Sequence, residues 1–166
     1  MTAALPPAVE ALITRAEALL ERLEQVLPHA AAAPDWATAI AWRYRRRGRG
    51  PVLEPVRHVG GIRLADLKEM DAQKERLVRN TEQFVAGRRA NNVLLTGARG
   101  TGKSSLVKAC LNEFAPRGLR LIEVDKADLV DLPDLVDLVD GRPERFIVFC
   151  DDLSFDEGEP GYKALK

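Results

Sequence analysis

The chain has 166 residues, 46% of them hydrophobic, a composition typical of one globular core with a small attachment. Lysine plus arginine and aspartate plus glutamate each number 25, so the zero net charge gives no overall attraction to nucleic acid or to anionic lipid. The apolar runs are too short to cross a bilayer, and the start does not have the pattern of a secretory signal, so we expect no membrane partner.

Both cysteines, Cys110 and Cys150, lie inside apolar stretches. We expect them to be small buried hydrophobic residues without a disulfide between them, as in proteins of a reducing compartment. The predicted localisation is therefore cytoplasmic.

A helix is predicted over residues 5–27, because apolar side chains recur at helical spacing until Pro28 ends the pattern. The stripe consists of Val9, Leu12, Ile13, Ala16, Leu19, Leu20, Leu23, Val26 and Leu27. We expect this stripe to pack on the same chain, with a partner helix as the alternative.

A second short helix is predicted to begin at an Asp35 cap, with Trp36, Ile40 and Tyr44 on one side. Five arginines crowd its end, namely Arg43, Arg45, Arg46, Arg47 and Arg49. We interpret them as a solvated basic end, with nucleic-acid binding as the alternative. Residues 1–50 are thus expected to be a helical N-terminal segment with a basic end.

Next, a helix is predicted over residues 64–86, ended by Gly87, and a buried strand over residues 91–96. After the loop described below, residues 105–114 have helical spacing until Pro116 and Gly118 stop the helix. The predicted order is therefore helix, strand, loop, helix.

The loop matches the phosphate-binding pattern G-x-x-x-x-G-K-[ST] without a mismatch. We expect its backbone N–H groups to surround the phosphates of ATP, with Lys103 on the β- and γ-phosphates and the Ser104 hydroxyl on Mg²⁺. The residues predicted to bind nucleotide are Gly97, Ala98, Arg99, Gly100, Thr101, Gly102, Lys103, Ser104 and Ser105.

Residues 119–124 are predicted to form a second strand. Acids then recur every third residue over 128–140 between leucines and valines, which predicts one or two short amphipathic helices, broken near Pro133 and closed by Gly141. A metal array is a weaker interpretation of these acids, because nothing orients them inward.

The apolar run over residues 146–150 predicts a strand that ends in Asp151 and Asp152. Such a strand carries an acid to the edge of the sheet where a nucleotide lies. We expect Asp151 to hold Mg²⁺ and Asp152 to act as the general base on the attacking water, with Lys103 as the other catalytic residue.

Together these segments resemble the bacterial AAA-type ATP-binding family known as domain of unknown function 815. The resemblance covers most of residues 43–166. The stretches that carry it are residues 71–75, 80–84, 91–95, 97–108, 121–124 and 149–155.

The resemblance implies an α/β fold of the P-loop NTPase class, AAA+-like, with a parallel sheet and flanking helices over residues 51–166. Residues 97–104 would be Walker A and Asp151–Asp152 Walker B, with an adenine pocket within residues 58–73. AAA+ proteins usually have Glu where Asp152 stands, so hydrolysis could be slow. A homo-oligomer is implied by the family alone, and the protein partner is unknown.

The resemblance also implies a sensor strand, an arginine finger and a lid beyond Walker B. We therefore expect the chain to be a fragment of a longer protein, incomplete after Walker B and inactive or weakly active as an ATPase. Two other functions remain open: a kinase-type phosphotransferase, in which residues 91–96 pair directly with 146–150, and a non-catalytic, nucleotide-bound interaction protein. The AAA+ interpretation instead predicts a gap or a partner strand between those two segments.

Overall fold

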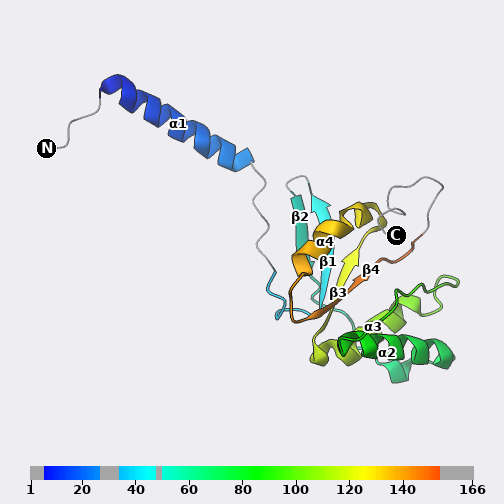
Figure 1. The fold of residues 1–166 in the computed structure, drawn as a ribbon. Helices are drawn as coiled ribbons and strands as arrows, with labels where there is room; N and C mark the ends of the chain where they lie inside the picture. The colour runs from blue at the N-terminus through cyan, green and yellow to red at the C-terminus, as the bar shows by residue number, and fades with distance from the viewer. Residues whose placement is uncertain (1–5, 27–33, 48–49, 154–166) are drawn as a thin grey trace.

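The computed structural model describes residues 6–26, 34–47 and 50–153 (Figure 1). Four strands form one sheet: β1 (Ala41–Arg47), β2 (Gly50–Pro55), β3 (Leu119–Val124) and β4 (Arg145–Phe149). The α-helices are α1 (Pro7–Val26), α2 (Asp71–Val85), α3 (Lys103–Phe114) and α4 (Leu132–Val139). Short 3-10 helices are η1 (Leu64–Asp66), η2 (Ala115–Arg117) and η3 (Lys126–Asp131).

The sheet has the order β2-β1-β3-β4 and is mixed. β3 pairs in parallel with β1 and β4, whereas β1 pairs with β2 in antiparallel fashion. The expected α/β class is confirmed, but a purely parallel sheet is wrong, because β1 and β2, which are separated by only two residues, pair in antiparallel fashion. Residues 41–47, which precede the predicted domain boundary at residue 50, lie in the same sheet as the strands that follow it.

The segment predicted as a second helix forms strand β1 instead. Trp42 and Tyr44 face one side of the sheet with 3% and 2% of their surface exposed, and Ala41 and Arg43 face the other side. This period of two lets β1 bury Trp and Tyr, residues that pack well on a pleated surface. Trp36, Ile40 and Tyr44 are four residues apart, a spacing that places side chains on one face of a helix and also on one face of a strand. The spacing alone therefore did not distinguish a helix from a strand.

The core lies on both faces of the sheet, which gives three layers (Figure 1). On one face, α3 and α2 pack on Leu119 and Leu121 of β3. On the other face, Ile122 and Val124 pack with residues of η3 and α4. β3 is buried on both faces because it is an inner strand of the sheet.

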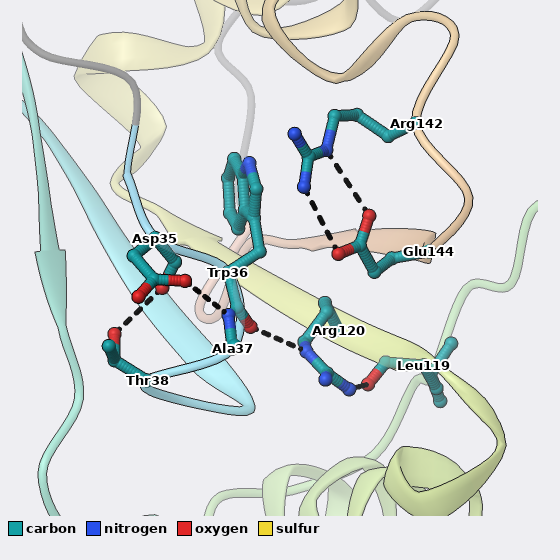
Figure 2. A network of polar contacts seen from close by, with 8 residues as sticks. All are labelled: Asp35, Trp36, Ala37, Thr38, Leu119, Arg120, Arg142 and Glu144. Atoms are coloured by element: carbon teal, nitrogen blue, oxygen red, sulfur yellow. Dashed lines mark hydrogen bonds and ion pairs between the residues drawn. The ribbon is translucent and has the colours of Figure 1, made fainter.

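Asp35 organises a turn rather than the start of a helix (Figure 2). Its carboxylate accepts a hydrogen bond from the backbone N–H of Ala37 at 3.0 Å, and its carbonyl accepts one from the Thr38 hydroxyl at 2.7 Å. The Arg120 guanidinium then donates to the carbonyls of Trp36, at 3.0 Å, and of Leu119, at 2.8 Å. The hydrogen bonds of this arginine therefore connect the turn to the start of β3.

Two arginines of the basic cluster bind acids on neighbouring elements. Arg43 donates from Nη2 to Glu123 of β3 at 2.7 Å, and Arg46 contacts Asp131 at 2.5 Å. The Tyr44 hydroxyl also donates to buried Asp131, at 3.0 Å, and its pKa is raised to about 12 by burial and by that carboxylate. The cluster's residues Arg43, Arg45, Arg46 and Arg47 thus belong to a strand and not to the solvated end of a helix, and Arg49 lies outside the described residues.

The helix predicted over residues 64–86 begins later than expected. η1 and the following residues form a separate turn, in which Glu69 adopts a left-handed φ of 58°, and α2 starts at Asp71. Such a φ is incompatible with a continuous right-handed helix. Helix 105–114, strands 119–124 and 146–150, and short helices in the acidic region are confirmed.

Both cysteines have free thiols. Cys110 is buried and Cys150 half-buried, and burial raises the pKa of each thiol. Neither is therefore activated as a thiolate.

α1 stands clear of the sheet and the other helices (Figure 1). Its side chains over residues 6–23 are all exposed, so the expected packing on the same chain is not formed. In the described parts of the chain, no helix has the length and apolarity that crossing a bilayer requires.

Candidate functional site

The segment ahead of the loop, residues 91–96, is not a strand, which corrects the prediction. Val93 and Leu94 are exposed at 50% and 76%, and β4 is paired in the described structure with β3. A strand forms only through hydrogen bonds to a neighbouring strand, and this segment has none in the described sheet. Instead, the Asn80 side chain of α2 forms two 2.9 Å hydrogen bonds with the backbone of Asn91.

Residues 97–102 form an irregular loop that leads directly into α3. Gly97, Gly100 and Gly102 have φ values of 142°, 82° and 85°, in the region that favours glycine. The Thr101 hydroxyl donates to the carbonyl of Ala98 at 2.8 Å and so ties the loop to itself. Glycine is therefore favoured at these three positions because of the local backbone conformation.

The N-terminus of α3 faces this loop without a side-chain cap. Gly102 is the cap residue, and the first turn contains no acidic residue. The first N–H groups of a helix lack partners within the helix, and the helix dipole adds positive potential there. These features suit an anion.

The Lys103 ammonium lies over the loop. Its Nζ donates to the carbonyls of Gly97 at 2.9 Å and Ala98 at 2.8 Å. The lysine is therefore folded back along the loop, where a polyphosphate held by the loop would meet its charge.

Ser104 and Asp151 are brought together from segments far apart in the sequence. The Ser104 hydroxyl donates to Asp151 Oδ2 at 2.6 Å. α3 supplies the serine in its first turn, and the segment directly after β4 supplies the aspartate. Both side chains were predicted to bind Mg²⁺, and this contact puts them in one place.

Asp152 follows with a left-handed φ of 51°. Its backbone N–H donates to Asp151 Oδ1 at 3.1 Å, and its side chain is exposed. Aspartate tolerates this backbone conformation better than glutamate does, which gives a physical reason for the shorter acid here. Of the other predicted residues, Arg99 is exposed and Ser105 is half-buried in the first turn of α3.

The donor set around Ser104 and Asp151 fits Mg²⁺ rather than a metal held by protein alone. The described residues contain no group of three or more His, Cys, Asp or Glu side chains that could hold a metal ion. Mg²⁺ typically takes one or two protein oxygens and completes its shell with water and substrate phosphates.

Met70 was predicted from the sequence only as part of the apolar face of the helix over residues 64–86, yet it lies against the loop. A Cβ built on Gly102 would come within 2.9 Å of Met70 Cε. This methionine belongs to the segment 58–73 that was expected to form the adenine pocket. One hollow, of about 670 Å³, is lined by residues 37–40, 55–61 and Asn112 and includes no residue of the loop.

Comparison with known proteins supports the family resemblance. Residues 37–166 match the family described as "Protein of unknown function (DUF815)". No curated protein and no solved structure matches the chain.

Proposed function

The chain belongs to the DUF815 family, and on that premise we propose that it is the nucleotide-binding module of an AAA+-type ATPase. It binds Mg-ATP and couples binding and hydrolysis to the remodelling of a protein partner. The fold underlying the proposal is a P-loop domain of the AAA+ kind, which the α/β sheet and the loop-to-helix junction support.

The contact between Ser104 and Asp151 is the observation that carries the proposal. A hydroxyl directly after the loop lysine and a carboxylate at the end of a sheet strand are what a loop-bound Mg-triphosphate needs. Bound there, Mg²⁺ would neutralise charge on the phosphates. Lys103 and the N–H groups of the loop and of α3 would hold the phosphate oxygens.

The kinase-type alternative is not separated from the AAA+ proposal by the order of the strands. It expects residues 91–96 to pair with β4, and these residues form no strand. The AAA+ expectation of a strand at 91–96 is equally unmet, so the strand order does not favour it either. The non-catalytic alternative would also bind nucleotide, and it differs from the proposed function only in lacking ATP turnover.

Asp151→Ala tests the proposed metal site. We expect Mg²⁺ to strengthen ATP binding to the wild-type chain, and the variant to lose most of that gain while keeping its Mg²⁺-free affinity. Titration calorimetry with and without Mg²⁺ measures both. Asp125→Ala removes an exposed acid that follows neighbouring strand β3 and is the matched control. An equal Mg²⁺ gain in Asp151→Ala would exclude Asp151 from the metal site.

Asp152→Asn tests the proposed base. We expect unchanged Mg-ATP affinity and a loss of about 100-fold or more in phosphate release, since a positioned base contributes about 100- to 10,000-fold. Release is followed over hours because turnover by the shorter acid is expected to be slow. Equal rates in the two proteins would eliminate Asp152 as the base. No release by the wild type would leave the non-catalytic alternative.

A further inference from the structure

The two ends of the loop over residues 97–102 are held in different ways. At its exit the chain continues directly into α3, whose Leu106 is buried in the core. At its entry, residues 91–96 pair with no strand of the described sheet, and Val93 and Leu94 are exposed. The position of the loop therefore depends on the contacts that attach this entry segment to the rest of the fold.

Asn80 of α2 provides such an attachment. Its Nδ2 donates to the carbonyl of Asn91, and its Oδ1 accepts from the N–H of Asn91, both at 2.9 Å. One side-chain amide thus satisfies both backbone groups of one residue, as the opposite residue of an antiparallel strand would. Asparagine can do this because it combines a donor and an acceptor in one short planar group. The Asn80 side chain therefore takes the place of a neighbouring strand at the start of the entry segment.

Asn80 is itself held close to α3. The next residue, Thr81, is 3% exposed, and its hydroxyl oxygen accepts a hydrogen bond from the Cys110 thiol of α3 at 3.4 Å. Helices α2 and α3 lie side by side (Figure 1). At the other end of α2, the cap residue Met70 lies against Gly102, the last residue before α3. α2 and its cap residue therefore contact the chain both ahead of the loop and at its exit.

We infer that Asn80 is a positioning residue for the nucleotide loop. Its two hydrogen bonds hold the entry segment on α2, and α2 packs on α3, which carries Lys103 and Ser104. A loop that is fixed at both ends loses less conformational freedom when it closes around phosphates, so the ligand binds more tightly. This inference rests on the proposed function, and Asn80 acts through the loop rather than on the phosphates.

Asn80→Leu tests the inference, because leucine has a similar size and cannot form either hydrogen bond. Titration calorimetry of the complete chain with ATP, with and without Mg²⁺, gives the affinities. We expect both to fall about tenfold, because two hydrogen bonds that organise the loop are lost. The gain from Mg²⁺ should stay that of the wild type, in contrast to Asp151→Ala. Affinities equal to those of the wild type would overturn the positioning role.

Further variants separate positioning from a general loss of stability. Asn91→Ala is the matched control, because it removes an amide side chain but keeps the backbone groups that Asn80 binds, and it should bind ATP like the wild type. Asn80→Asp has the same shape but cannot donate, so it should weaken binding as well and replaces the leucine variant if that variant does not fold. A lower melting temperature with unchanged affinity of the folded variants would show that Asn80 only stabilises the fold, which would overturn the inference.

Hydrogen exchange of the nucleotide-free chain tests the attachment without any ligand. We expect the N–H of Asn91 to exchange about tenfold faster or more in Asn80→Leu than in the wild type, because its acceptor is lost. Equal exchange rates would overturn the inference whether or not the chain binds nucleotide. Faster exchange together with a wild type that binds no ATP would instead refute the proposed function, and the positioning role with it.

Discussion

Replacing Lys103 with alanine is expected to weaken Mg-ATP binding by about 100-fold. The substitution removes a positive charge that lies over the loop, where it contacts the carbonyls of Gly97 and Ala98. Losing one member of a close, hydrogen-bonded charge pair typically costs a few kcal/mol, and about 1.4 kcal/mol corresponds to a tenfold change. Titration calorimetry of the wild type and the variant measures the effect.

Lys108→Ala is the matched control, because it removes the same charge from an exposed position further along α3. We expect its Mg-ATP affinity to stay near that of the wild type. Equal affinities of Lys103→Ala and the wild type would remove the lysine from the site. If the wild type itself bound no Mg-ATP, the proposed function would be wrong.

Replacing Trp36 with alanine is expected to lower the free energy of unfolding by about 3–5 kcal/mol. Trp36 is 2% exposed, and its ring makes edge-on contacts with Trp42 at 5.2 Å and Phe146 at 4.7 Å between centroids. Since a whole domain is stabilised by only about 5–15 kcal/mol, this loss is a large fraction of the total, and the variant should unfold at a clearly lower urea concentration. Urea unfolding followed by circular dichroism measures the loss.

Two further variants show whether the aromatic contact is responsible. Trp36→Phe keeps a ring between β1 and β4 and should lose much less stability than Trp36→Ala. Leu94→Ala truncates a side chain that is 76% exposed and should change stability by less than about 0.5 kcal/mol. A Trp36→Ala variant as stable as the wild type would show that the turn at residues 35–38 contributes little to the core.

Local pattern predicted the elements whose signals lie within a short stretch of the chain. Helix α3 follows from the loop, the spacing of its apolar residues and the stop at Gly118. Strand β4 follows from an apolar run bounded by charge, and β3 follows from a short, mostly apolar stretch that begins directly after Gly118. The local conformation of the loop follows from its glycines, since few other residues adopt their backbone angles.

The two wrong elements were decided by distant neighbours. Residues 41–47 became a strand because β3, some eighty residues later, pairs with them and buries Trp42 and Tyr44. Residues 91–96 have the apolar character of a strand but no neighbouring strand in the described sheet. The strand propensity of a single segment predicts neither outcome, since strand pairing is a property of two segments.

The sequence by itself determined the loop, its lysine and serine, the paired aspartates and the family, because each depends on residue type and spacing within a short stretch. The tertiary structure alone decided the mixed sheet, the contact between Ser104 and Asp151, and the exposure of α1. The physical reason is that hydrogen-bond partners and burial depend on where distant segments meet in space, which no local pattern encodes.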